Sequence, residues 1–329
     1  MSFGFFGHDH AYVPAAPAVL PGIETPGELY QALRRCWCAE TCAPRMRKDW
    51  TPECPTLGQC SVTSFLAQDL FGGKVYGIPL EEGGFHCYND AGGCVFDLTS
   101  EQFPNRVFRY GDQPEQFRDV HFAKEEKRLR YELLWSRLRD FCGSPEGLRF
   151  RKNNLRVRLK ARAMQLPPAD SAAAGREIAE HLLSSPLWQD ARTVFLFRSL
   201  PSEPDTAPLI GAARAEGKTV LLPRCVSPEE MEAVPFLPDT PLQAGAYGIP
   251  YPEGPAFEGD PDLVLVPCLS VTRQGVRLGR GAGYYDRYLA RHPGKRICLC
   301  LDRMLSDSLP EGPFDVRVPL VLTEKGFIG

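Results

Sequence analysis

Short runs of apolar residues alternate with amphipathic segments along the C-terminal half of the chain. The apolar runs "RTVFLFRS", "KTVLLPRC", "PDLVLVPCLSV" and "KRICLCLD" are rich in β-branched and aromatic residues, which is typical of buried strands. Helical segments are predicted between them at 172–184, 206–216 and 284–291. This alternation predicts a mostly parallel sheet covered by helices, with ligands bound outside the carboxyl ends of the strands.

The N-terminal half has a different pattern. Helices are predicted at 28–37 and from near Gly58, followed by a β-hairpin around "YNDAGGCVFDLT". In "KEEKRLRYELLWSRLRDF" (124–141) the apolar residues recur at helical spacing, so a long amphipathic helix is predicted there. "CGSPEG" (142–147) breaks that helix and marks the predicted domain boundary.

The length of 329 residues and the apolar fraction of 43% suffice for two cores. We therefore predict a flexible N-terminal arm at 1–27 and a smaller α+β domain at 28–146, with a papain-like type as its expected fold. A three-layer α/β domain is predicted at 147–329.

The charge and cysteine content exclude several classes of protein. A net charge of −3 indicates no particular partner. No apolar run reaches the ~18 residues that span a bilayer, and the N-terminus has no signal-peptide pattern, so a cytoplasmic protein without membrane contact is expected. The twelve cysteines are predicted to be reduced thiols. Their densest group, Cys36 to Cys60, lacks the paired spacing of a zinc site.

A glycine loop precedes the last predicted helix in "RLGRGAGYYDRYL" (277–289). Gly279, Gly281 and Gly283 permit close backbone approach to a ligand, and the unpaired N–H groups of a helix N-terminus favour an anion. Tyr284 excludes both standard nucleotide-binding glycine signatures. The spacing therefore indicates a phosphate site of another kind.

A tight strand-to-helix turn, with glycines that serve only packing, is the alternative for this loop. Arg277, Arg280 and Asp286 around it favour phosphate, because two guanidiniums and a carboxylate suit an anion and its metal ion.

The same stretch resembles the C-terminal signature of the 5-formyltetrahydrofolate cyclo-ligase family, and the resemblance extends over about 151–323. "KNNLRVRLKAR", "SEPDT", "KTVLLPRC" and "FDVRVPLVLTEKG" resemble the other blocks of that family, in the same order. The resemblance implies an ATP- and Mg²⁺-dependent reaction. ATP phosphorylates the formyl oxygen of 5-formyltetrahydrofolate, the N10 amine attacks the activated carbon, and phosphate leaves to give 5,10-methenyltetrahydrofolate.

The resemblance also implies roles for individual residues. Lys152 and Arg280 would stabilise charge during phosphoryl transfer. Asp286 and Asp315 would bind Mg²⁺. The residues that would bind ATP are Lys152, Asn153, Asn154, Leu155, Arg156, Arg277, Leu278, Gly279, Arg280, Gly281, Ala282, Gly283, Tyr284 and Tyr285. The residues that would bind folate are Arg198, Glu203, Arg280, Gly281, Ala282, Gly283 and Tyr284.

Each of these assignments has a structural alternative. The basic run 149–162 could be a solvated helix face or a nucleic-acid patch, but it lacks interleaved aromatic residues, so nucleic acid is not the expected partner. Glu203 could be a helix-start charge. Asp286 could pair with Arg287 or Arg291 on a helix surface.

Three positions depart from the family pattern. Tyr251 stands where many members have an acid, Phe314 where they often have histidine, and Pro319 replaces a polar residue. Tyr251 and Phe314 leave open an alternative function for the whole chain, a nucleotide- or phosphate-binding regulator without folate chemistry.

The N-terminal half contains a candidate nucleophile, base and orienting acid. Cys60 stands at a predicted helix N-terminus in "CPTLGQCSVTSFLAQDLFGG", His86 on a probable strand, and Asp97 on the next strand. A helix N-terminus stabilises a thiolate, and a histidine with a carboxylate completes the set. The alternative is a buried cysteine and a hydrogen-bonded hairpin histidine.

This half resembles the YunG-like proteins over about 29–103, which implies no chemistry of its own. Two classes stay open for it: a cysteine hydrolase or amidase that uses Cys60, and a ligand-binding module.

Overall fold

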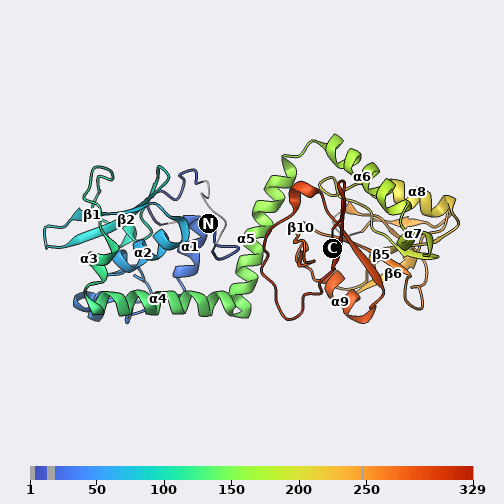
Figure 1. Ribbon diagram of the computed structural model, residues 1–329. Coiled ribbons are helices and arrows are strands. Elements are labelled where there is room, and N and C mark those ends of the chain that lie inside the picture. The colour runs from blue at the N-terminus through green and yellow to red at the C-terminus, as the bar shows by residue number, and fades with distance from the viewer. Residues whose placement is uncertain (1–3, 13–18, 246–247, 329) are drawn as a thin grey trace. The chain divides into compact units, whose positions relative to one another are not determined.

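The computed structural model describes residues 4–12, 19–245 and 248–328 (Figure 1). The chain divides into two compact units, Met1–Asn154 and Leu155–Gly329. This division falls later in the chain than the predicted boundary at 146/147. Among the described residues, no helix combines the length and the apolar character needed to cross a membrane.

The first unit packs helices against a small antiparallel sheet of order β1-β2-β3. Its core contains residues of α1, α2 and α4 together with side chains of the sheet. The elements are α1 (Pro26–Leu33), η1 (Pro44–Asp49), α2 (Cys60–Phe71), β1 (Lys74–Pro79), β2 (Phe85–Ala91), β3 (Cys94–Phe96), η2 (Ser100–Gln102), α3 (Arg118–Phe122) and α4 (Glu125–Gly143).

Helix α1 shows how local sequence sets an element. The Thr25 side chain accepts from the backbone N–H of Glu28, and the Glu28 carboxylate accepts from that of Thr25, so the capping box fixes the helix start. The predicted helix 28–37 was too long: α1 ends at Leu33. The amides of Cys36 and Trp37 both bond to the Leu33 carbonyl, which turns the chain there.

The N-terminal segment contributes to this unit as well. Phe5 and Ile23 are buried in its core, and Phe6 forms a β-bridge with Asp97. The described part of the predicted arm therefore packs against the first unit, whereas 1–3 and 13–18 lie outside the described residues.

Helix α5 (Pro145–Met164) contains the division between the units. Phe150 packs on the core of the first unit. Leu155, Leu159 and Ala163 are buried in a core of the second. This spacing of four residues places the three side chains on one face of the helix.

The second unit contains a seven-stranded sheet of order β14-β13-β12-β9-β4-β5-β6. Its central pairs, from β13 to β5, are parallel, and the edge strands β14 and β6 are antiparallel. The strands are β4 (Thr193–Phe195), β5 (Thr219–Cys225), β6 (Met231–Pro235), β9 (Leu263–Pro267), β12 (Lys295–Leu299), β13 (Leu320–Thr323) and β14 (Gly326–Ile328), with two small hairpins, β7 (Leu242–Gln243) with β8 (Tyr251–Pro252) and β10 (Ser270–Val271) with β11 (Arg277–Leu278).

Helices cover both faces of this sheet (Figure 1). Alternate residues of the strands enter two separate cores, so Val264 and Val266 pack on one face while Leu263 and Leu265 pack on the other. One core includes α5 and α9 (Tyr284–Arg291), and the other includes α6 (Pro168–Leu183), α7 (Pro186–Gln189) and α8 (Ala207–Ala215). The predicted three-layer α/β fold is confirmed.

Candidate functional site

The glycine loop lies between strand β11 and helix α9, and the helix is the one predicted to follow it. Gly283 is the N-cap of α9 with φ 72°, and Gly281 has φ 114°. These are conformations that side chains other than glycine rarely adopt. The helix begins at Tyr284 without a side-chain cap among the described residues, so its first amides point toward the loop.

Arg156 of α5 reaches this loop. Its Nε donates to the Gly279 carbonyl at 2.9 Å, and a Cβ built on Gly281 would lie 3.3 Å from the Arg156 Cζ. Burial lowers the pKa of Arg156, while the charges of Asp315 and Asp286 oppose that shift. The Arg156 guanidinium thus lies within electrostatic range of two carboxylates.

Arg277 and Asp286 form a second, more buried pair. The Arg277 Nη2 lies 2.7 Å from the Asp286 Oδ1, which also accepts from the Val316 backbone N–H at 3.2 Å. The pair thus connects β11, α9 and the C-terminal segment. The structural alternative for Asp286, a surface pair with Arg287 or Arg291, is not what the structure has: Arg287 donates to backbone carbonyls, and Arg291 pairs with Glu230.

Glu203 and Arg280 are brought together from distant parts of the sequence. The Glu203 Oε1 accepts from Arg280 Nε at 3.0 Å and Nη2 at 2.9 Å. Its Oε2 accepts from the Leu200 backbone N–H at 2.9 Å. The Glu203 side chain is 6% exposed and that of Arg280 31%, so the pair spans from the interior to an accessible surface.

The predicted ATP-binding segment of α5 falls on both sides of the unit division. Lys152, Asn153 and Asn154 belong to the first unit, and Leu155 and Arg156 to the second. The Asn154 Nδ2 donates to the Gly22 carbonyl at 2.8 Å. The Leu155 side chain is part of the hydrophobic core, so only its backbone remains for a ligand.

The other predicted loop residues are held by the fold. Leu278 is buried, and the Tyr284 hydroxyl donates to the Ser227 carbonyl at 2.9 Å. The Tyr285 hydroxyl is buried without a hydrogen-bond partner among the described residues, and burial raises its pKa. An unsatisfied buried hydroxyl near the loop is free to bond to a ligand.

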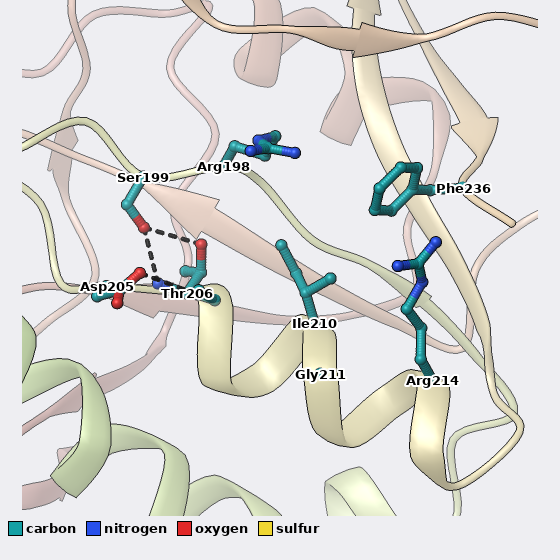
Figure 2. Close-up of a pocket in the computed structure, with 9 residues that line it drawn as sticks. Arg198, Ser199, Asp205, Thr206, Ile210, Gly211, Arg214 and Phe236 are labelled. Carbon is teal, nitrogen blue, oxygen red and sulfur yellow. Dashed lines mark hydrogen bonds between the residues drawn. The ribbon is translucent and has the colours of Figure 1, made fainter. Parts of the chain in front are cut away.

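Arg198 lines a pocket of about 380 Å³ beside α8 (Figure 2). The Ser199 Oγ accepts from the Thr206 backbone N–H at 2.8 Å, which fixes the start of α8. The residues that line this pocket include neither Glu203 nor the glycine loop: they are Arg198, Ser199, Asp205, Thr206, Ala207, Ile210, Gly211, Arg214 and Phe236.

The predicted magnesium ligands are two carboxylates, those of Asp286 and Asp315. Within the described ranges, no group of three or more His, Cys, Asp or Glu residues is arranged to hold a metal. Asp286 is occupied in part by Arg277, and the Asp315 Oδ2 accepts from the Gly312 backbone N–H at 2.6 Å. Mg²⁺ commonly takes one or two carboxylates, with phosphate oxygens and water completing its shell. Asp286 and Asp315 therefore suit a Mg²⁺ ion whose other ligands come mainly from a nucleotide.

Two of the three positions that depart from the family pattern, Phe314 and Tyr251, lie away from the hydrophobic cores. Phe314 is 88% exposed, and Tyr251 is a half-buried residue of the β7–β8 hairpin, where it pairs with Gln243.

The first unit brings Cys60, His86 and Asp97 together. Cys60 is the first residue of α2, and His86 lies on β2, which α2 packs against. The His86 Nε2 lies 2.6 Å from the Asp97 Oδ2, and both side chains are fully buried. The Cys60 thiol lies 4.0 Å from the carbonyl oxygen of Phe85, the residue before His86, and packs against the buried cluster that contains Cys87. Asp97 directly follows β3 rather than lying within it.

Sequence reasoning missed the groups that hold Asp97. The Tyr110 hydroxyl donates to its Oδ2 at 2.9 Å, and the Thr99 N–H and hydroxyl donate to its Oδ1 at 3.0 and 3.2 Å. The Asp-x-Thr spacing in "FDLTS" was a usable signal, because an aspartate side chain often accepts from the amide two residues on. No local signal indicates Tyr110.

The second unit is thus an α/β protein of three layers, with a glycine loop at the N-terminus of helix α9. Residues 149–324 match the sequence profile of the 5-formyltetrahydrofolate cyclo-ligase family. The chain belongs to this family. A 5-formyltetrahydrofolate cyclo-ligase of Mycolicibacterium smegmatis is 34% identical over 187 residues, which cover 53% of this chain and 94% of that protein.

A solved structure was also found: the NMR structure of Aquifex aeolicus 5,10-methenyltetrahydrofolate synthetase. It has 27% identity and a TM-score of 0.49, and covers 54% of this chain and 91% of its own.

The first unit has a separate match. Residues 25–143 match the profile of the YunG protein family. The uncharacterized protein YunG of Bacillus subtilis is 39% identical over 80 residues, which cover 24% of this chain and 62% of that protein.

Proposed function

We propose that the chain catalyses the ATP-dependent cyclisation of 5-formyltetrahydrofolate to 5,10-methenyltetrahydrofolate, with release of ADP and phosphate. The observation that carries the proposal is the set of arginines at the glycine loop. Arg156 and Arg280 both lie there, and each is oriented by a hydrogen bond. Phosphoryl transfer requires mainly this kind of positioning and charge neutralisation.

The residues have distinct roles in this proposal. The amides of the glycine loop and the N-terminus of α9 bind the phosphates of ATP. Lys152 and Arg156 add positive charge from α5, and Arg280 stabilises charge on the transferred group. Glu203 holds Arg280 and accepts N–H donors of the pterin ring.

Magnesium would be held by Asp315 and Asp286 together with the nucleotide. A hard cation neutralises the charge that develops on the transferred phosphoryl group. The Arg277 guanidinium lies 2.7 Å from the Asp286 carboxylate, so Asp286 has less of its charge available to bind the metal ion.

The proposal is tested by mixing the protein with MgATP and 5-formyltetrahydrofolate and measuring methenyl absorbance. Turnover that requires ATP, and that a chelator abolishes, is the expected result. Folate binding without turnover would contradict the proposal and favour a regulator.

A further inference from the structure

We propose that the first unit carries a second catalytic site, which hydrolyses an amide or ester through a Cys60 acyl intermediate. His86 acts as the base and acid of this site. Asp97 is the positioning residue that orients the imidazole. The observation behind the proposal is the arrangement of these three side chains between helix α2 and the hairpin β2–β3.

The His86 imidazole has one ring nitrogen, the one not bonded to Asp97, available for proton transfer. One ring nitrogen of His86 bonds to Asp97, while the other, Nδ1, is buried and has no hydrogen-bond partner among the described residues. The ring is stacked on Phe108 at 5.1 Å and lies edge-on to Phe103 at 4.8 Å. A fully buried nitrogen without a partner is rare unless function requires it.

Asp97 is held more firmly than a simple structural bridge needs. Donors from His86, Tyr110 and Thr99 satisfy both of its oxygens. A carboxylate fixed in this way sets the tautomer and orientation of the imidazole, and stabilises its protonated form. Tyr110 is fixed in turn, because its ring stacks on Phe6 at 3.9 Å.

The charges also favour a reactive thiolate. Hydrogen bonding from Cys87 and interaction with His86 outweigh burial and hold the pKa of Cys60 well below its usual range. Burial opposes protonation of His86, yet the charge and hydrogen bond of Asp97 raise its pKa to about 10. The two shifts have opposite directions, and both favour a thiolate–imidazolium pair, the reactive state of a cysteine nucleophile.

The other cysteines provide a contrast. Cys225 is exposed, but burial of its thiol group still raises its pKa. Burial likewise raises the pKa of Cys36, Cys42, Cys94 and Cys142. The lowered pKa of Cys60 is thus a property of its site and not of the chain in general.

Helix α2 supplies a place for the oxyanion. It has twelve residues, and no side chain of the described segments caps its N-terminus. Cys60 is its first residue, so the amides of the first turn lie beside the thiol. These amides and the positive end of the helix stabilise negative charge on a carbonyl oxygen.

The reaction balances with water as the only co-reactant. The thiolate forms a bond to the carbonyl carbon, and as the amine or alcohol leaves, His86 donates its proton to it. Water then attacks the thioester while His86 takes a proton. The carboxylic acid departs, and the thiolate–imidazolium pair is restored.

Thiol reactivity in the full-length chain is the first test. Iodoacetamide is applied over a range of pH, and each cysteine is followed by peptide mass spectrometry. We expect Cys60 to react at least about tenfold faster than Cys225 at neutral pH, with a midpoint well below that of a free thiol. Faster labelling of the more exposed Cys225 would show that accessibility alone sets the rate of alkylation, and would overturn the proposal.

Acyl transfer is the second test, with p-nitrophenyl acetate as the probe. We expect a burst of p-nitrophenol, one acetyl group on Cys60 by mass, and slow turnover, all lost in Cys60→Ser. Asp97→Asn should raise the pH midpoint of labelling, and Tyr110→Phe should raise it less. An Asp97→Asn protein that is folded but has an unchanged midpoint would contradict the role of Asp97.

The contact between Cys60 and Cys87 defines the competing outcome. If oxidised glutathione links the two thiols in a disulfide, and p-nitrophenyl acetate leaves Cys60 unmodified, the site is a dithiol redox centre and the hydrolase proposal fails. Cyclo-ligase activity is measured in parallel, so that failure of either proposal is distinguishable from failure of the other.

Discussion

Glu203 and Arg280, which are 77 residues apart in the sequence, form an ion pair in which one carboxylate oxygen accepts from two guanidinium nitrogens. The other oxygen is held by the Leu200 amide. The carboxylate is nearly buried while the guanidinium is accessible. The glycine loop is thereby fixed at its centre to the segment that follows β4.

Removal of Arg280 should therefore affect both chemistry and stability. We expect Arg280→Ala to lower the cyclisation rate by about a hundredfold or more, because a charge-stabilising donor is lost. The unpaired Glu203 should also destabilise the second unit by about 3 kcal/mol. Methenyl absorbance and thermal unfolding measure the two effects separately.

The matched control for this variant is Arg224→Ala. Arg224 pairs with Glu232 at 2.6 Å across β5 and β6, so a similar ion pair is broken elsewhere in the unit. Turnover should persist in that variant. Equal losses of turnover in Arg280→Ala and Arg224→Ala would reduce the role of Arg280 to stability.

The magnesium requirement distinguishes the two acidic residues. Asp315→Asn keeps the acceptor for the Gly312 amide but removes a charge, so about tenfold more Mg²⁺ should be needed for half-maximal turnover. Asp307→Asn, an exposed position, is the control. A Mg²⁺ titration of Asp315→Asn that matches the control would remove Asp315 from the metal site.

Asp286→Asn should behave differently, because Asp286 pairs with the buried Arg277. Loss of this charge leaves a guanidinium without its partner, which typically costs about 3–5 kcal/mol. We expect a lower melting temperature together with the higher Mg²⁺ requirement. A change in the Mg²⁺ requirement alone would show that the ion pair contributes little.

The pattern of the sequence predicted some parts of this site and not others. The helix at 284–291 and the glycines before it follow from local spacing and agree with α9. Asp286 was expected to bind Mg²⁺, and the structural alternative was an ion pair with Arg287 or Arg291, since helix neighbours are the nearest candidates. The actual partner, Arg277, is on β11, and such a pairing depends on how strand and helix pack.

In the N-terminal unit, too, local features were predictable and tertiary contacts were not. Cys60 at a helix start and His86 on a strand were visible as local features. The hydrogen bond from Tyr110 that holds Asp97 was not visible in the sequence, because Tyr110 reaches Asp97 from a loop that has no regular pattern. Contacts that depend on tertiary structure leave no periodic signal in the sequence.

His121 should make the first unit sensitive to acid. It is buried against Phe65, with Lys127, Arg118 and Arg130 nearby. Burial and these charges lower its pKa to about 4. A lowered folded-state pKa contributes stability above the unfolded value near 6.5, and this contribution is lost as the pH falls toward 4, up to about 3 kcal/mol.

The test compares unfolding of the wild type and His121→Phe at pH 7.5 and pH 5. The variant cannot take up a proton, so its stability should fall less between the two values. His181→Gln, at an exposed position of α6, serves as the control. If His121→Phe and the wild type lose the same stability, another group causes the acid sensitivity.

The last prediction concerns the division between the units. A chain that begins at Gly147 keeps α5 from that residue onward and all residues of the two cores around the large sheet. We expect it to fold and to catalyse cyclisation at a rate within about threefold of the full chain, because the site proposed for phosphoryl transfer is retained.

Lys152→Ala in this shortened chain tests whether the start of α5 contributes to that site. Loss of its charge should lower turnover by at least about tenfold and raise the KM for ATP. Lys160→Ala, at an exposed position of the same helix, is the control and should have little effect. An insoluble shortened chain would mean that the units fold only together. A folded but inactive one would mean that cyclisation requires the first unit, and the independence of the two halves would have to be abandoned.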